Sequence, residues 1–414
     1  MPGFILNDGA VVPPSVYSAM NTVLNKKLGT SQVYPPRDWA AIVKDLVPLP
    51  LKSASGSIAH FEDGADTVPL KSLSYRFTPT QSGTGDPSPT NPRPITGVSS
   101  VNVMSAGKNL AKNVIFAYNP YASMTFDKAF FLPVGTYRCS ISNAANMTSW
   151  RFGFRLFASD GTAIVNGITN GYVTLAPNFG WSDTYSSGTI IMESTDRTDT
   201  QVLLTIVKAC YVVPCIGFGD VSASSAADYQ LELGSTATTY EPYQATLIPV
   251  SLGQTVYGGE GNEAGEFANK FGIALDLSAL SWTYQSANNS FVSTSLASLV
   301  KAPPNNSTVV ENALCEIYKV DISNNTASSA YDNIIAVSSN GNLQIRDTNL
   351  SGDLDALATR LNGIKFVYPL ATPATLSVDP VAISSRLGVN NIFLDLAASE
   401  IECEYYADPT LSTL

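Results

Sequence analysis

Trp150-Arg-Phe-Gly-Phe-Arg-Leu-Phe157 alternates between large apolar residues and other residues. The apolar side chains take every second position from Trp150 to Leu156, and Arg151 and Arg155 fall between them. Successive side chains of a β-strand point to opposite faces of the sheet, so this period of two predicts a strand with one buried face. Asp160-Gly161 follows and is typical of a hairpin turn.

The segments on either side, within residues 106–247, carry the same signal. Two of them alternate with one apolar face each: Tyr137, Cys139 and Ile141 in the first, and Tyr229, Leu231 and Leu233 against Gln230 and Glu232 in the second. Val202–Val213 is a continuous apolar run, which predicts a buried core strand. Short strands separated by turn residues predict a β-sandwich or jelly roll for 106–247.

Residues 248–414 predict a second β domain with short helices. Asp353–Leu361 predicts one helix and Pro380–Leu387 a second. The stripe expected to face the core in the first helix is Leu354, Leu357 and Leu361. A terminal strand is expected over 401–406, with its inward side chains being Ile401, Cys403 and Tyr405. The expected fold is mainly β, with a short N-terminal helical leader before two β-sandwich or jelly-roll-like domains.

Residues 1–50 form the expected helical leader. Apolar residues recur at helical spacing after Pro13-Pro14, and a second short helix is expected around residue 39. Two short helices with one apolar stripe each make a poor core, so the leader is expected to attach to another protein. The residues expected to form this attachment surface are Val16, Met20, Val23, Leu24 and Trp39.

Residues 51–105 predict a β segment followed by a linker. Ser74-Tyr-Arg-Phe77 alternates as a strand does, whereas Thr78–Pro94 is dense in Thr, Gly, Asp, Ser and Pro. A stretch of that composition cannot bury enough apolar surface to fold alone. It is therefore expected to be a linker unless a neighbouring segment orders it.

The composition disfavours several classes of function. Only 14% of the 414 residues are charged and the net charge is −11, with no dense basic run, so nucleic-acid binding is not expected. No run of about 18 apolar residues and no N-terminal secretion signal occur, so neither a membrane span nor conventional secretion is expected. The five cysteines are expected to be free and buried, while a Cys210–Cys215 pair is left open.

Residues suited to nucleophilic or metal chemistry are sparse. His60 is the only histidine and no Gly-x-Ser-x-Gly motif accompanies it, so neither a catalytic relay nor a His-rich metal site is expected. Glu62, Asp63 and Asp66 supply only part of a calcium ligand set, and a solvated acidic turn is the favoured interpretation.

A glycosidase needs only two carboxylates. Glu193, Asp196 and Asp199 lie near one another in sequence, but any chain of this length offers such groups. The sequence therefore predicts no enzyme, no cofactor and no metal site.

Sugar binding needs aromatic faces beside polar groups, and the predicted sandwich offers both. Trp181, Asp183 and Tyr185 share a loop-like stretch, and Arg151 and Arg155 share the polar face of their strand. Packing at one end of the core is the commoner role for a large aromatic such as Trp181, and solvent is the commoner neighbour of the two arginines. Core packing of Trp181 and solvent exposure of the arginines therefore remain alternatives to a glycan-binding site.

Asn21–Ala40, Pro92–Gly97 with Gly107–Leu110, and Gln230–Tyr243 are distinctive strings rather than catalytic signatures. They resemble the leader and the two ends of a carbohydrate-binding-like jelly roll in virion proteins of tailed bacteriophages of Gram-positive hosts. Those proteins include minor tail proteins, tail fibres and head fibres. Three further strings resemble a C-terminal module of such proteins: Tyr368–Pro373, Leu387–Ile392 and Glu404–Pro409. Val256–Glu260 departs from the pattern, so the second domain is expected to begin differently.

The resemblance implies a non-enzymatic, fibre-like virion protein, assembled in the host cytoplasm and attached to other virion proteins by its N-terminus. A homotrimer is expected by analogy with phage fibres, and a host-surface carbohydrate is an expected ligand of the jelly roll. One alternative is a purely structural head-fibre, decoration or baseplate protein without a host ligand. A cell-wall glycosidase is the less favoured alternative.

Overall fold

The structure of this chain is a computed structural model. It describes residues 4–5, 11–12, 21–22, 51–63, 70–117, 124–142, 150–164, 171–175, 179–182, 191–194, 200–218, 228–302, 312–320 and 332–406. The chain divides into two units, Met1–Lys52 with Tyr406–Leu414, and Ser53–Tyr405. In the first unit, β1 (Phe4–Ile5) pairs with β2 (Val11–Val12).

The expected attachment surface of the leader lies outside the described residues. This applies to Val16, Met20, Val23, Leu24 and Trp39. The second unit has a mainly β fold, as the alternating segments predict. Among the described residues no helix is long and apolar enough to span a membrane.

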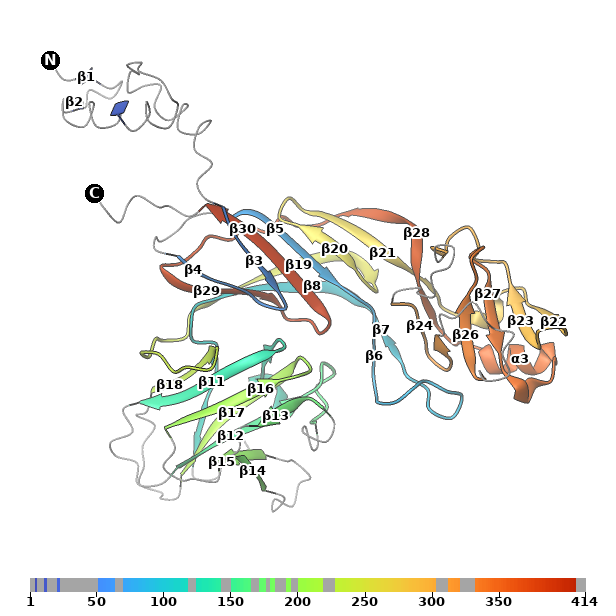
Figure 1. The fold of residues 1–414 in the computed structure, drawn as a ribbon, viewed down its shortest axis with the longest axis horizontal. Helices are drawn as coiled ribbons and strands as arrows, with labels where there is room; N and C mark the ends of the chain where they lie inside the picture. Colours follow the sequence, from blue (N-terminus) through green and yellow to red (C-terminus); the bar gives the residue numbers. More distant parts are fainter. Residues whose placement is uncertain are drawn as a thin grey trace. The chain divides into compact units, whose positions relative to one another are not determined.

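Two sheets built from segments far apart in the sequence form what we call the scaffold (Figure 1). The larger sheet has the order β24 (Leu314–Cys315), β28 (Phe366–Ser377), β21 (Glu266–Ala274), β20 (Gly259–Asn262), β5 (Leu70–Phe77), β30 (Ser399–Tyr406) and β3 (Leu51–Gly56). The smaller sheet has the order β19 (Ala245–Val256), β8 (Val98–Ala106), β29 (Gly388–Leu394) and β4 (Ala59–Asp63).

Apolar faces of the two scaffold sheets share one core. Tyr75, Phe267 and Ile401 from the larger sheet are buried in the same cluster as Val103 and Ile392 from the smaller sheet. Ile401, Cys403 and Tyr405 all point inward, as their alternation predicts. Tyr75 needs a glycine opposite it, because a Cβ on Gly261 would lie 2.3 Å from the ring carbon Cζ.

Residues 107–244, called the sandwich, are inserted between β8 and β19 of the scaffold. One sheet has the order β10 (Phe130–Leu132), β17 (Cys210–Phe218), β12 (Trp150–Phe157), β15 (Ile191–Ser194) and β14 (Phe179–Ser182), with β9 (Ile115–Ala117) parallel to β17. The other has the order β13 (Val173–Leu175), β16 (Gln201–Ile206), β11 (Gly135–Ser142) and β18 (Asp228–Leu233). A short 3-10 helix, η2, spans Phe126–Lys128.

Residues 277–365, called the C-terminal module, are inserted between β21 and β28. Their sheet has the order β22 (Thr283–Gln285), β23 (Ser290–Ser293), β27 (Leu343–Arg346), β26 (Ile334–Val337) and β25 (Lys319–Val320). The short helices are η3 (Leu277–Ala279), η4 (Thr348–Leu350) and α3 (Leu354–Leu361). Asp353 caps α3 by accepting hydrogen bonds from the backbone amides of Asp355 and Ala356.

The sheets divide the chain differently from the boundaries drawn at 105 and 247. Strand β5, from the segment expected to end in a linker, pairs with β20 and β30, which come from beyond residue 258. Strand β4 likewise pairs with β29. Alternation along a strand predicts which face is buried but not which strand lies beside it, so these pairings were not predictable.

The stretch Thr78–Pro94 is an ordered arm rather than a free linker. The arm, residues 78–97, contains the pair β6 (Thr80–Gln81) and β7 (Ile95–Thr96). A neighbouring segment orders it, because the backbone amide of Arg93 donates to the carbonyl of Glu316 in the C-terminal module at 2.7 Å.

The single strand expected over 202–213 is two strands in opposite sheets. Gln201–Ile206 forms β16 and Cys210–Phe218 forms β17. The chain turns between them where Val207 is exposed and the Lys208 ammonium lies 4.5 Å from the centre of the Tyr172 ring. A charged side chain in an apolar run marks this break.

The helix expected over Pro380–Leu387 does not form. Val381, Ile383 and Ser385 are buried while the residues between them are exposed, which is the period of an extended chain. The backbone amide of Val381 donates to Glu263, and the amide of Leu70 donates to the carbonyl of Ile383. Pairing with these neighbours therefore replaces helical hydrogen bonds.

The thiols of the described residues follow the expectation of free, buried cysteines. Cys139, Cys210, Cys215, Cys315 and Cys403 are all buried and form no disulfide with one another. The question left open for Cys210 and Cys215 is answered by their place in β17, where both are core residues without a disulfide.

Candidate functional site

The residues expected to bind sugar are only partly within the described structure. The backbone of Trp181 lies in β14, paired with Met192, and Asp183 and Tyr185 lie outside the described residues. Arg151 and Arg155 lie in β12, opposite Gly217 and Val213 of β17. Through β15, Trp181 stands in register with Phe154, so two strand spacings, roughly 10 Å, separate Trp181 from the strand that carries both arginines.

Arg155 packs against protein groups, whereas solvent is the commoner neighbour of an arginine on a polar strand face. Its Nη1 donates to the carbonyl of Met124 at 2.6 Å, and its guanidinium lies 5.0 Å from the centre of the Phe157 ring. Burial lowers the pKa of Arg155 below its ordinary value. The same face carries a small buried cluster that includes Met124, Phe157 and Val213. Arg155 thus fastens residues 124–129 onto the sheet.

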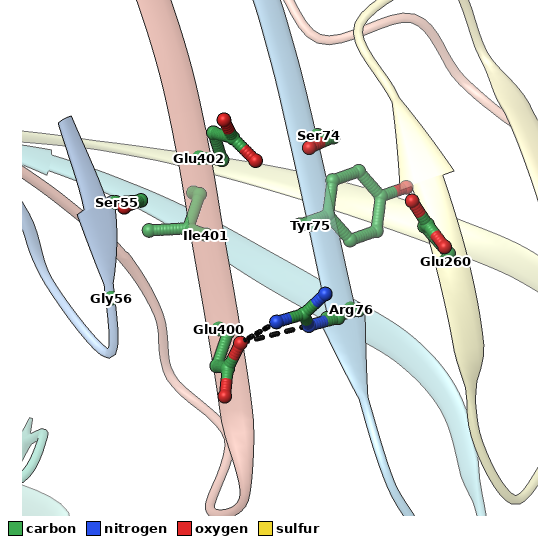
Figure 2. Close-up of a pocket in the computed structure, with 9 residues that line it drawn as sticks. All are labelled: Ser55, Gly56, Ser74, Tyr75, Arg76, Glu260, Glu400, Ile401 and Glu402. Carbon is green, nitrogen blue, oxygen red and sulfur yellow. Dashed lines mark hydrogen bonds and ion pairs between the residues drawn. The ribbon is translucent and has the colours of Figure 1, made fainter. Parts of the chain in front are cut away.

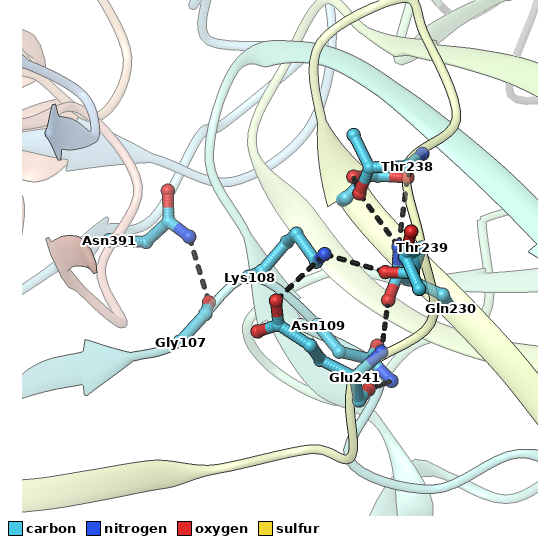
Figure 3. A network of polar contacts seen from close by, with 9 residues as sticks. Gly107, Lys108, Asn109, Gln230, Thr238, Thr239, Glu241 and Asn391 are labelled. Atoms are coloured by element: carbon cyan, nitrogen blue, oxygen red, sulfur yellow. Dashed lines mark hydrogen bonds and ion pairs between the residues drawn. The ribbon is translucent and has the colours of Figure 1, made fainter. Parts of the chain in front are cut away.

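Gly107–Leu110 and Gln230–Tyr243 meet at one place, where the chain enters and leaves the sandwich (Figure 3). We call this cluster the root clasp, and its members are Lys108, Asn109, Gln230, Glu232, Thr238 and Glu241. The sequence strings contain these residues, and the polar side chains of β18 are buried although they alternate with its apolar ones. Gln230 is 1% exposed and Glu232 is 3% exposed.

Asn109 is the centre of the clasp. Its Nδ2 donates to the carbonyls of Tyr229 and Glu241, each at 3.0 Å. Its Oδ1 accepts from the backbone amides of Ala111 at 3.0 Å and Leu231 at 3.1 Å. The side chain is 2% exposed, so one amide group satisfies four backbone groups that have little access to water.

Gln230 and Glu232 continue the clasp into the loop after β18. The Glu232 carboxylate accepts from Gln230 Nε2 at 2.9 Å, from the Thr238 amide at 2.8 Å and from the Thr238 hydroxyl at 2.6 Å. Gln230 Oε1 accepts from the Glu241 amide at 2.8 Å. A buried carboxylate is costly unless it is hydrogen-bonded, and here it folds the loop back onto its own strand.

Lys108 and the neighbouring glycine close the clasp and join it to the scaffold. Lys108 Nζ donates to the carbonyl of Thr239 at 2.6 Å and pairs with Glu241 at 2.8 Å. The Gly107 amide donates to the carbonyl of Gln244 at 2.8 Å, and Asn391 Nδ2 donates to the carbonyl of Gly107 at 2.9 Å. The first and last residues of the sandwich are therefore hydrogen-bonded to each other.

The only histidine is part of this joint. His60 Nδ1 lies 2.8 Å from Asn391 Oδ1, on the strand pair β4–β29. The same Asn391 holds Gly107. His60 therefore braces an amide that connects the scaffold with the sandwich.

Of the acidic residues considered for calcium or glycosidase chemistry, the structure describes Glu62, Asp63 and Glu193. Glu62 and Asp63 pair with Val389 and Gly388 at the end of β4, and Asp66 lies outside the described residues. Glu193 lies in β15, and Asp196 and Asp199 are likewise not described. No group of three or more metal-binding side chains occurs in the part of the chain that the structure describes.

A hollow of about 260 Å³ lies on the larger scaffold sheet (Figure 2). Arg76 and Glu400 form an ion pair across β5 and β30, and Lys270 forms another with Glu260. Glu402, the next residue of β30 on the same face as Glu400, is paired with Ser74 of β5. Glu400 raises the pKa of Arg76 above its ordinary value through their hydrogen bond and charge attraction.

The hollow can offer carboxylate, guanidinium and hydroxyl groups on rigid strands to a polar ligand. Its remaining lining includes Ser55, Gly56 and Ile401. Tyr75 also lines it, but its ring is buried in the scaffold core, and burial raises its pKa to about 12. Sequence reasoning missed this surface, although the alternation of Glu400, Glu402 and Glu404 with the inward residues of β30 could have indicated it.

Comparisons with protein-family models, with curated proteins and with solved structures found no match to this chain.

Proposed function

We propose that this chain is a fibre-like appendage protein of a tailed-phage virion. It attaches to other virion proteins through residues 1–50, assembles as a homotrimer and contacts host-surface glycans through the sandwich. It works by presenting shaped surfaces rather than by breaking bonds.

The observation that carries the proposal is the root clasp. The strings that resemble phage proteins are the ones whose side chains join the two ends of the sandwich, with Asn109 bonded to Tyr229, Leu231 and Glu241. The resemblance therefore concerns how a β module is mounted on a scaffold. A mounted module is what an appendage protein requires.

The position of the only histidine also supports a role without catalysis. His60 lies beside Asn391, which joins the scaffold to the sandwich, and no nucleophile is described beside it. The five cysteines, the other common nucleophiles, are buried, and burial raises the pKa of the Cys139, Cys210 and Cys315 thiols to about 12. Thiols in that state are poor nucleophiles.

A purely structural head-fibre, decoration or baseplate protein is the second candidate. It is favoured by Arg155, one of the residues expected to contact sugar, because this side chain packs under residues 124–129. In this alternative the sandwich contacts only other virion proteins.

Sedimentation of phage particles tests the virion assignment. We expect the full chain to sediment with particles purified from a lysate, and a variant lacking residues 1–50 to stay in the soluble fraction. Recovery of the full chain only in the soluble fraction would contradict the assignment, and equal sedimentation of both chains would contradict attachment through the leader.

Binding to immobilised cell-wall glycans of Gram-positive bacteria separates the two candidates. We expect Trp181→Ala to weaken binding by about tenfold, the effect of removing an aromatic contact. Glu402→Gln in the scaffold hollow is the matched control. Loss of binding in the Glu402 variant alone would move the glycan contact to the scaffold, and no binding by the unaltered chain would favour the structural candidate.

A further inference from the structure

The arm, residues 78–97, has a tip that is held in shape by the side chains of Arg93 and Asn91. Arg93 donates to the carbonyls of Ser82 at 2.8 Å, Gly83 at 2.9 Å and Gly85 at 2.5 Å. Asn91 Nδ2 adds bonds to the carbonyls of Thr84 and Asp86. The tip therefore has a fixed shape even though it has no apolar core of its own.

The base of the arm is bound to the C-terminal module through Glu316. The Glu316 carboxylate accepts from the Ile95 amide at 3.3 Å and from the Lys365 amide at 3.0 Å. Its carbonyl accepts from the Arg93 amide at 2.7 Å. The side chain is 12% exposed. If the carboxylate were removed, water could not readily replace its hydrogen bonds to the two backbone amides.

Two further contacts bind the arm at the same place. Gln81 Nε2 donates to the carbonyl of Cys315 at 2.9 Å, and Ile95 is buried beside Phe271 and Val367. An exposed ion pair between Lys319 and Asp86 lies at the edge of this contact.

The other backbone contacts described between the C-terminal module and the scaffold involve β21 and β28. It is inserted between β21 and β28, which pair at Ala274 and Phe366, and its strand β24 pairs with β28 at Cys315 and Phe366. A loop contact from Leu299 and Lys301 reaches Ala371 and Pro369, which lie on the same strand β28. These contacts all lie at one end of the larger sheet, so the module can still bend and twist about β28, whereas a contact from a separate segment of chain resists both motions.

We propose that residues 78–97 are a strap that fixes the C-terminal module to the scaffold, with the Glu316 carboxylate as its latch. The strap limits bending of the β21–β28 stem. This inference does not depend on the virion assignment, because the strap would fix the orientation of the C-terminal module relative to the scaffold in any function.

Two measurements on the full chain test the strap. The first is amide hydrogen exchange of residues 80–96 and of the stem. The second is the distance distribution between spin labels on Ser100→Cys in β8 and Ala358→Cys in α3. Both positions are exposed and the native cysteines are buried, so the labels are selective.

We expect Glu316→Ala and, separately, Gln81→Ala to speed exchange of the arm amides by roughly tenfold to a hundredfold. The first variant removes the acceptor of a backbone amide, and the second removes the hydrogen bond between the arm and the Cys315 carbonyl. The spin-label distances should broaden in both variants, while exchange in the sandwich stays unchanged. Glu316→Gln keeps an acceptor oxygen and should restore part of the protection.

Asp86→Asn is the matched control on the same arm. It removes only the exposed ion pair with Lys319, which contributes little, so both measurements should match the unaltered chain. A released arm with an unchanged distance distribution would overturn the strap, since the module would then keep its orientation without it. Unchanged arm exchange in Glu316→Ala would overturn the latch. If Glu316→Ala fails to fold, Gln81→Ala alone decides between a strap and a passive loop.

Discussion

Asn109 shows how one buried amide can fix the ends of a domain. Its two polar atoms satisfy four backbone groups from three separate segments. Replacing it leaves donors and acceptors that water cannot easily reach, and each unsatisfied group of this kind costs about 1–3 kcal/mol. The side chain is therefore more important to stability than its size suggests.

We expect Asn109→Ala to lower the free energy of unfolding by about 3 kcal/mol, since its buried partners lose their hydrogen bonds. Asn113→Ala is the control, because Asn113 is exposed and makes one long bond of 3.4 Å to the carbonyl of Lys128. Denaturant unfolding of both variants provides the comparison. Equal effects would mean that the clasp does not hold the sandwich together.

Asp395 gives the joint between scaffold and sandwich a dependence on pH. Its carboxylate accepts from the Asn102 side chain at 2.7 Å and the Asn102 amide at 3.2 Å, and the hydroxyl of Tyr211 donates to its carbonyl at 3.3 Å. Burial raises the pKa of Asp395 above its ordinary value. The folded protein therefore binds this proton more tightly than the unfolded chain does.

A raised carboxyl pKa means stability that is present at low pH and lost as the pH rises through the folded-state pKa. We expect the unaltered chain to gain stability relative to Asp395→Asn between neutral pH and about pH 4, the ordinary carboxyl pKa. Unfolding free energies of both proteins across this range provide the measurement. A constant difference would show that Asp395 ionises normally in the folded state.

Among the elements, α3 separates a buried stripe from an exposed face within two turns. Leu357 and Leu361 are fully buried in the core of the C-terminal module, whereas Leu354 is 43% exposed. The stripe expected from the sequence included all three, and the first residue of the helix falls outside the core because it lies at the helix end.

Leu357→Ala is expected to cost about 2–5 kcal/mol of unfolding free energy, the usual range for a buried leucine. Leu354→Ala on the same helix should stay within about 0.5 kcal/mol of the unaltered chain, as exposed substitutions do. Thermal or denaturant unfolding checks both. A large effect at Leu354 would indicate a partner that covers this end of α3.

The alternation of apolar residues predicts where strands form far better than it predicts which strands pair with each other. The alternating apolar residues of β11 and β30 are buried as expected, because period two decides which face is covered. The opposite face of β18, with Gln230 and Glu232, is buried as well, because the loop after β18 covers it with hydrogen bonds. The glutamate-lined hollow was not predicted, because its residues come together only through the register of β5 with β20 and β30. A local sequence pattern does not encode that register.

At the scale of the whole molecule, the scaffold depends on segments from both ends of the chain. Strand β5 lies between β20 and β30, so the larger sheet cannot close without residues 70–77. The sandwich differs, because the Gly107 amide and the Gln244 carbonyl already meet at 2.8 Å. Its contacts with the scaffold include Ile58 and Phe393, which pack into its core.

We therefore expect a chain of residues 107–244 to fold alone, with some loss of stability from the missing Ile58 and Phe393 contacts. A chain of residues 248–414 should not form the scaffold sheets, because β5 and β8 are missing. Circular dichroism and cooperative unfolding distinguish the two outcomes. A stable, cooperative 248–414 fragment would show that the second predicted domain is independent after all.

Immunogold electron microscopy of intact phage particles tests the proposed function most directly. An antibody against the sandwich should label particles at one defined structure, with the label lost when the gene is deleted from the phage. Particles that carry no label while the protein accumulates free in the lysate would contradict a virion appendage.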